Sequence, residues 1–78
     1  MDLRQLRHFI AVANARSFSR AAQQLNMAQP PLSRTIRQLE EAVGGSLFDR
    51  AARPLVMTPL GQLLYEQARQ VLERMDDM

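Results

Sequence analysis

Apolar positions along the first third of the chain recur with the period of an α-helix. Asp2, followed three residues later by Gln5, predicts a capping box at the start of a helix over about residues 3–15. A second apolar stripe predicts a short helix over about residues 18–25, with Ser17 as its N-cap. Asn26 tolerates a left-handed backbone and would end this helix sharply.

A third helix is predicted after a short break. Pro30 and Pro31 fit only the first turn of a helix, where a missing N–H costs nothing, and Gly44 with Gly45 ends the pattern. The buried stripe of this helix is predicted to be Leu32, Ile36, Leu39 and Val43. Two short helices joined by a turn of about three or four residues form a helix-turn-helix, and we interpret the second and third helices as this motif.

Two short segments that suit β-strands follow the third helix, at residues 47–50 and 55–58. The four residues between them include Arg53 and Pro54, so the tip of the hairpin is basic. We interpret this segment as a small β-hairpin, the wing of a winged helix-turn-helix.

The last segment has the pattern of a long helix that pairs with a second copy. Thr58 as N-cap and Pro59 at the first helical position predict its start. Apolar residues then alternate three and four positions apart, as in a coiled coil. The seam predicted to form the dimer interface is Leu64, Ala68, Val71, Met75 and Met78. The residues beside it, expected to contact the preceding helices, are Leu60, Leu63 and Leu72.

These elements predict a mainly α fold. Residues 1–58 are expected to form a winged helix-turn-helix of three helices plus a small hairpin, and residues 59–78 a linker and dimerisation helix. A chain of this length buries only roughly 60% of its unfolded surface, so we expect it to gain stability from a partner copy or a larger parent chain. Because the chain ends on an apolar seam residue without a cap, we expect the protein to continue.

Composition narrows the classes of function. The chain has no cysteine, which excludes disulfides and thiolate zinc sites, and the lone His8 cannot form a metal site by itself. No constellation of acid–base groups is evident, and Ser33 has no histidine within plausible reach, so we expect no enzyme, metal or cofactor in this segment. Neither a membrane span nor a signal peptide is apparent, which predicts a cytoplasmic protein.

Charge is distributed unevenly along the chain. All ten basic residues are arginines, and residues 1–58 hold eight of them against four acidic residues, a balance of +4, whereas residues 59–78 carry −2. A basic head with an acidic tail suits binding of a polyanion through the head. Many small domains are slightly basic, so charge alone leaves other functions open.

Polar side chains gather opposite the apolar stripe of the third predicted helix. They are Gln29, Ser33, Arg34, Arg37 and Gln38. In the major groove arginine can bind guanine through two hydrogen bonds, glutamine can do the same for adenine, and serine can serve either. The same set also suits a helix face exposed to water, and the residue types alone do not decide between the two.

The sequence in and around these elements resembles the LysR-type transcriptional regulators. The segments that carry the resemblance are residues 17–22, Leu25, residues 29–36, residues 39–41, Gly44, residues 47–50 and residues 58–61, so that it covers nearly the whole chain. The resemblance implies a winged helix-turn-helix followed by a dimerising linker helix. It also implies, for the full-length protein, a separate effector-binding domain and tetramers built from dimers.

The resemblance also implies roles for individual residues. The residues that would meet base edges are Gln29, Pro30, Ser33 and Arg34. Arg53, with Pro54, would enter the minor groove from the wing. Candidate phosphate contacts are Ser17, Arg20, Arg37 and Arg50. Two positions depart from the family pattern: Ala28 stands where serine or threonine is frequent, and Leu60 where alanine is frequent.

We therefore expect sequence-specific binding of double-stranded DNA by a homodimer, in the control of transcription. The main alternative is an α-helical adaptor whose last helix binds a helix of another protein. It explains residues 59–78 equally well, but not the cluster of Gln29, Ser33, Arg34 and Arg37. An enzyme fragment is the second alternative and lacks a catalytic constellation. A small-molecule effector is expected for the full-length protein.

Overall fold

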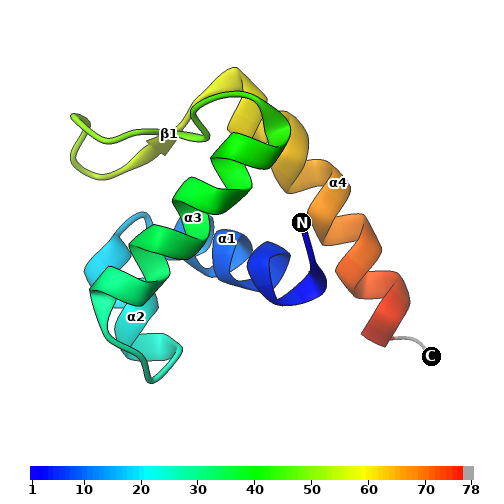
Figure 1. The fold of residues 1–78 in the computed structure, drawn as a ribbon, viewed down its shortest axis with the longest axis horizontal. Coiled ribbons are helices and arrows are strands. Elements are labelled where there is room, and N and C mark those ends of the chain that lie inside the picture. The colour runs from blue at the N-terminus through cyan, green and yellow to red at the C-terminus, as the bar shows by residue number, and fades with distance from the viewer. Residues whose placement is uncertain (77–78) are drawn as a thin grey trace.

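The computed structural model describes residues 1–76 and consists there of four helices and one two-stranded hairpin (Figure 1). The elements are α1 (Leu3–Ala15), α2 (Phe18–Gln24), α3 (Gln29–Val43), β1 (Phe48–Asp49), β2 (Val56–Met57) and α4 (Pro59–Asp76). The predicted fold class, a mainly α winged helix-turn-helix followed by a long helix, is confirmed.

Local signals place the helix ends as the sequence predicts. The side chain of Asp2 accepts from the Gln5 N–H at 2.8 Å, and the Gln5 side chain accepts from the Asp2 N–H at 3.2 Å, which completes the capping box. Ser17 accepts from the N–H of Arg20 at 3.2 Å and caps α2. Asn26 has a φ of 54°, so the left-handed turn after α2 is also confirmed.

The core lies where α1, α2 and α3 meet. Phe9 and Ile36 are fully buried there. The ring of Phe48, from β1, contacts both Phe9 and Phe18, with centroid distances of 5.5 and 5.9 Å. This aromatic cluster joins the hairpin to the helices and thereby fixes the position of the wing relative to α3.

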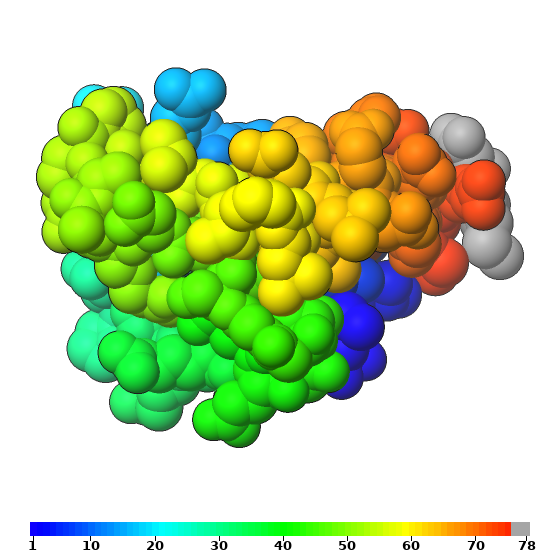
Figure 2. Space-filling view, turned by 90° about the horizontal axis from the view of Figure 1, so that it is seen from above, coloured from blue at the N-terminus to red at the C-terminus, as the bar shows by residue number. Residues whose placement is uncertain are grey.

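The hairpin is shorter than predicted, because only two residues on each strand pair. Phe48 lies opposite Met57, and Asp49 opposite Val56. The wing is nevertheless bound to the end of α1: just before β2, the Leu55 N–H donates to the Arg16 carbonyl at 3.1 Å. The wing and the C-terminal half of α4 lie at opposite ends of the molecule (Figure 2).

Helix α4 contacts α1, and this corrects part of the predicted seam. Ala68 is 1% exposed and Leu72 is 8% exposed within the single chain, so Ala68 faces the head and is unavailable to a partner. Leu63, expected to contact the head, is instead 61% exposed. The prediction placed these two residues on the wrong faces because it could not know which side of α4 the head would cover.

The remaining predicted seam positions differ in exposure. Val71 is 40% exposed and Met75 43% exposed, whereas Leu64 is half-buried against the core. Met78 lies outside the described residues. No helix within the described residues has both the length and the apolar character needed to cross a membrane.

Candidate nucleic-acid interface

Helix α3 separates a buried face from an exposed polar edge. Its buried residues are Leu32, Thr35, Ile36 and Leu39. On the other side Gln29, Arg34 and Arg37 are exposed and Ser33 is half-buried. The helix begins at Gln29 with proline in its first turn, and Ala28 in the N-cap position makes no side-chain cap bond. The first turn of α3 is therefore left without a capping side chain.

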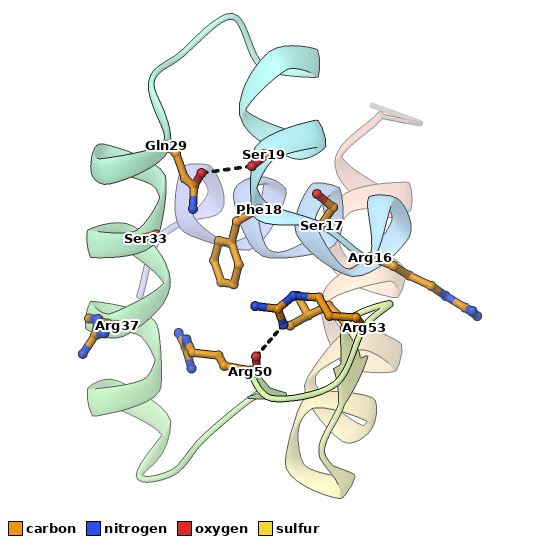
Figure 3. Close-up of a pocket in the computed structure, with 10 residues that line it drawn as sticks. Arg16, Ser17, Phe18, Ser19, Gln29, Ser33, Arg37, Arg50 and Arg53 are labelled. Carbon is orange, nitrogen blue, oxygen red and sulfur yellow. Dashed lines mark hydrogen bonds between the residues drawn. The ribbon is translucent and has the colours of Figure 1, made fainter.

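A hollow of about 340 Å³ lies between α3, the start of α2 and the wing (Figure 3). Its lining residues are Arg16, Ser17, Phe18, Ser19, Gln29, Ser33, Arg37, Arg50, Arg53 and Leu55. Six residues predicted as DNA contacts thus come together from three elements. The predicted contacts that do not line the hollow are Arg20, Pro30, Arg34 and Pro54.

The wing arginine lies over the hairpin and not away from it. The guanidinium of Arg53 donates through Nη1 to the carbonyls of Arg50 and Ala52, and its head points toward the hollow (Figure 3). The side chain is exposed. Its contacts are therefore with its own loop, at the edge where a ligand of the hollow would approach.

The structure gives Arg50, one of the predicted phosphate contacts, a partner inside the protein. Its guanidinium forms two hydrogen bonds with the carboxylate of Glu40, at 3.0 and 3.1 Å. The guanidinium carbon also lies 5.4 Å from the ring centroid of Phe18. This pair joins the C-terminal half of α3 to the first strand of the wing.

The pKa of the Glu40 carboxyl reflects this arrangement. Burial alone would raise the pKa, but hydrogen bonds from Arg50 and from the Leu47 N–H, together with the charges of Arg50 and Arg37, lower it below its ordinary value of 4.5. The carboxylate is consequently charged at neutral pH and holds Arg50 in place.

Two serines at the start of α2 have different roles. The Ser17 oxygen already accepts from the Arg20 N–H as the helix cap, and its hydroxyl hydrogen remains available as a donor. Ser19 donates to Oε1 of Gln29 at 3.0 Å, a contact between α2 and α3 that the sequence did not indicate.

Arg16 lines the hollow but is not among the contacts predicted from the sequence. It ends α1 in the left-handed conformation, with a φ of 54°. Its backbone carbonyl accepts from Leu55, the residue before β2, and its exposed side chain points outward, whereas that of Arg53 points toward the hollow (Figure 3). Only the contact between α1 and the wing reveals this position, since nothing in the local sequence distinguishes Arg16 from other surface arginines.

Helices α2 and α3, the turn between them, and a wing that borders the same hollow define a winged helix-turn-helix protein. The chain belongs to the family described as bacterial regulatory helix-turn-helix protein, lysR family, whose model matches residues 3–62. The resemblance found in the sequence is thereby confirmed.

Among curated proteins, the chain is 59% identical over 78 residues to a probable cat1 operon transcriptional activator of Acinetobacter lwoffii. It is 47% identical over 78 residues to the transcriptional regulator BenM of Acinetobacter baylyi. Both matches cover 100% of this chain and 26% of the relative, so the chain spans about a quarter of their length. These relatives are regulators of transcription, in agreement with the expectation that the chain is not an enzyme.

The chain also matches solved structures of transcription regulators in complex with DNA. The chain matches the BenM DNA-binding domain in its complex with catB site 1 DNA with a TM-score of 0.96 and 47% identity, covering 100% of this chain and 84% of that one. It matches DarR of Vibrio fischeri in complex with DNA with a TM-score of 0.93 and 36% identity, covering 99% of this chain and 26% of that one.

Proposed function

We propose that this chain binds double-stranded DNA sequence-specifically and is the DNA-binding part of a bacterial transcription regulator. The observation that carries the proposal is the hollow between α3 and the wing, which gathers donor side chains from three elements on one side of the molecule. The similarity to DNA-bound domains of the same family supports it.

The exposed edge of α3 has the chemistry to read bases in the major groove. Arg34 has no hydrogen bond or ion pair among residues 1–76, so its guanidinium can bind a guanine edge through two bonds. Gln29 and Ser33 lie nearer the start of the same helix and add an amide and a hydroxyl, and Pro30 offers apolar contact. We assign these four residues to base contacts.

The position of the hollow suggests which residues contact the phosphate backbone of the DNA. With α3 in the major groove and the wing in the adjacent minor groove, the phosphate strand between the grooves would pass over the hollow. Arg16 and Arg37 flank it on opposite sides (Figure 3). We assign both, with Ser17 and Arg20, to phosphates, which position a protein on DNA without reading its sequence. Arg53 and Pro54 are assigned to the minor groove, where a narrow A·T-rich groove attracts arginine.

Two substitutions test whether α3 reads the bases while the wing binds the minor groove. Arg34→Ala should weaken binding to a selected site far more than to random duplex, since one good two-bond contact discriminates by about 1–3 kcal/mol. Arg53→Ala should weaken binding mostly where the flanks are A·T-rich, and lower the slope of log affinity against log salt by somewhat under one unit. The measurement is fluorescence anisotropy at several salt concentrations, on a duplex selected from random DNA.

The outcomes separate the proposal from its alternative. An equal loss on selected, flank-swapped and random DNA for Arg34→Ala would make α3 a backbone-binding helix. Failure of the unaltered chain to enrich any sequence, or to bind DNA at low salt, would favour the protein-interaction adaptor.

We further propose that α4 pairs two copies. Leu63, Val71 and Met75 are exposed apolar residues on one i, i+4 row of the helix, interrupted by Gln67. Half-buried Leu64 lies at the margin of this row. A surface of this kind on a small domain suits burial against a second copy.

A charge at the centre of this row tests the pairing. Val71→Asp should yield a monomer with weak DNA binding, because a buried unpaired charge costs several kcal/mol. Gln62→Asp, on another face of α4, serves as the matched control and should remain dimeric. Sedimentation would contradict the proposal if the Val71 variant kept the mass of a dimer.

For the full-length protein we propose, from family membership alone, control by a small-molecule effector and assembly of dimers into a tetramer in the cytoplasm. The chain spans 26% of its relatives, so the effector site would lie outside it. Sedimentation of the longer protein, with and without small organic acids, tests both points.

A further inference from the structure

One hydrogen bond joins the two helices of the helix-turn-helix at their exposed surface. The hydroxyl of Ser19, from α2, donates to Oε1 of Gln29, the first residue of α3, at 3.0 Å. Both side chains are exposed. Ser17 and not Ser19 caps α2, so this bond is not needed to begin the helix.

The bond determines which end of the Gln29 amide faces the ligand. A glutamine amide has an acceptor oxygen and a donor nitrogen. The oxygen of Gln29 is turned toward Ser19, and the nitrogen points toward the hollow (Figure 3). An unrestrained glutamine can offer both atoms to adenine, accepting from its 6-amino group and donating to N7. With its oxygen engaged, Gln29 offers chiefly its donor.

We propose that Ser19 is a positioning residue that makes Gln29 read hydrogen-bond acceptors on DNA. The groups that fit are purine N7, guanine O6 and thymine O4, and a two-bond contact with adenine is disfavoured. This inference rests on the proposed function, because it concerns how Gln29 meets a base. It adds to that function a residue on α2 that determines base preference without touching the base.

The side chains around Gln29 also favour a ligand that presents hydrogen-bond acceptors. The other side chains at this edge that could meet a base or phosphate are those of Ser33, Arg37 and Arg53; the two arginines only donate hydrogen bonds, and the Ser33 hydroxyl can donate as well as accept. The nearest acidic group on α3, Glu40, is occupied by its two bonds with Arg50. A ligand at this edge therefore needs acceptors. One hydrogen bond of ordinary net strength biases the amide orientation by about fivefold.

The test uses base analogues in a duplex selected from random DNA by the unaltered chain. The position read by Gln29 is located first, as the base pair at which preference is lost in Gln29→Ala. Adenine is then placed there and replaced either by 7-deazaadenine, which lacks the N7 acceptor, or by purine deoxyriboside, which lacks the 6-amino donor. Affinities are measured by fluorescence anisotropy.

For the unaltered chain we expect about fivefold weaker binding on loss of N7, and less than a twofold change on loss of the 6-amino group. In Ser19→Ala the amide is free to turn, so loss of either group should weaken binding by about fivefold. Ser19→Thr retains the hydroxyl and should restore the original profile. Ser46→Ala, a serine outside the hollow, is the matched control, and the melting temperatures of all variants are compared.

Two results would overturn the inference while leaving DNA binding intact: the same analogue profile in Ser19→Ala as in the unaltered chain, or sensitivity of the unaltered chain to loss of the 6-amino group. If the unaltered chain selects no sequence at all, the proposed function fails, and the inference fails with it. A role of Ser19 in stability alone would lower the melting temperature and weaken binding to every duplex equally, which also contradicts the proposal.

Discussion

Replacing Glu40 with alanine should loosen the connection between α3 and the wing. Its carboxylate accepts three hydrogen bonds, from the Leu47 N–H at 2.8 Å and from Arg50 at 3.0 and 3.1 Å. The Glu40 side chain is 14% exposed and that of Arg50 36% exposed. The variant leaves the Leu47 N–H without its acceptor and removes the counter-charge of Arg50.

The expected size of the effect follows from this partial burial. An exposed ion pair contributes about 0–1 kcal/mol, whereas breaking a fully buried pair costs about 3–5 kcal/mol. Glu40 lies between these limits, so we expect Glu40→Ala to lower the free energy of unfolding by about 2 kcal/mol. For a domain of this size that is a fall in melting temperature of about 10 °C.

The pH dependence supplies a second measure of the same interaction. Because the folded-state pKa of Glu40 is lowered below 4.5, its contribution is full above the unfolded-state pKa and is lost as pH falls through the folded-state pKa. The difference in unfolding free energy between the unaltered chain and Glu40→Gln should therefore be constant at neutral pH and shrink below about pH 4.5.

Urea unfolding at several pH values measures both effects. Glu41→Ala, the adjacent exposed glutamate, is the matched control and should change stability by less than about 0.5 kcal/mol. A double-mutant cycle with Arg50→Ala isolates the pair itself. If the Glu40 and Glu41 variants unfold alike, or if the cycle shows no coupling, the pair does not hold the wing in place.

Two further predictions concern the ends of helices and are checked by thermal unfolding. Ala28→Ser should raise the melting temperature by about 5 °C, because a cap bond missing from α3 contributes about 1 kcal/mol; an unchanged value would mean that the first turn is satisfied otherwise. Gly61→Ala should be destabilising by about 1–3 kcal/mol, because its Cβ would lie 2.1 Å from the Leu47 carbonyl oxygen, which outweighs the better helix propensity of alanine. Gly45→Ala, whose Cβ would meet only the end of a flexible side chain, is its control, and equal losses in both would contradict the argument.

The helix boundaries were predictable because their signals are local. The capping box at Asp2, the cap at Ser17 and the left-handed Asn26 each depend on residues within one turn of the chain. The strands were predicted at the correct place but too long, since the pairing of residues across a hairpin depends on more than strand propensity. The faces of α4 were partly wrong, because its apolar residues serve both the head and the exposed row.

The position of the candidate interface could be predicted from the sequence, but the contacts made by each arginine could not. Ten identical side chains differ only in their neighbours, and the neighbours that matter are distant in sequence. Arg50 meets Glu40 ten positions away, and Arg53 folds onto carbonyls of its own loop. Arg16 reaches the hollow because the wing returns to the end of α1.

Because some arginines have partners inside the protein and others do not, net charge alone is a poor guide to DNA binding. Residues 1–58 carry a balance of +4, yet a phosphate meets individual guanidinium groups and not a sum. Six arginines have no hydrogen bond or ion pair through their side chains in the part of the chain that the structure describes: Arg4, Arg16, Arg20, Arg34, Arg37 and Arg74. Three of them, Arg16, Arg20 and Arg37, are the arginines assigned above to phosphates. An arginine that is already paired with a carboxylate, as Arg50 is with Glu40, neutralises a phosphate less completely, so fewer counterions are released from the DNA. The salt dependence of DNA binding should accordingly follow these three positions, together with Arg53 of the wing, more closely than it follows the formal charge, with Arg50→Ala acting mainly through stability.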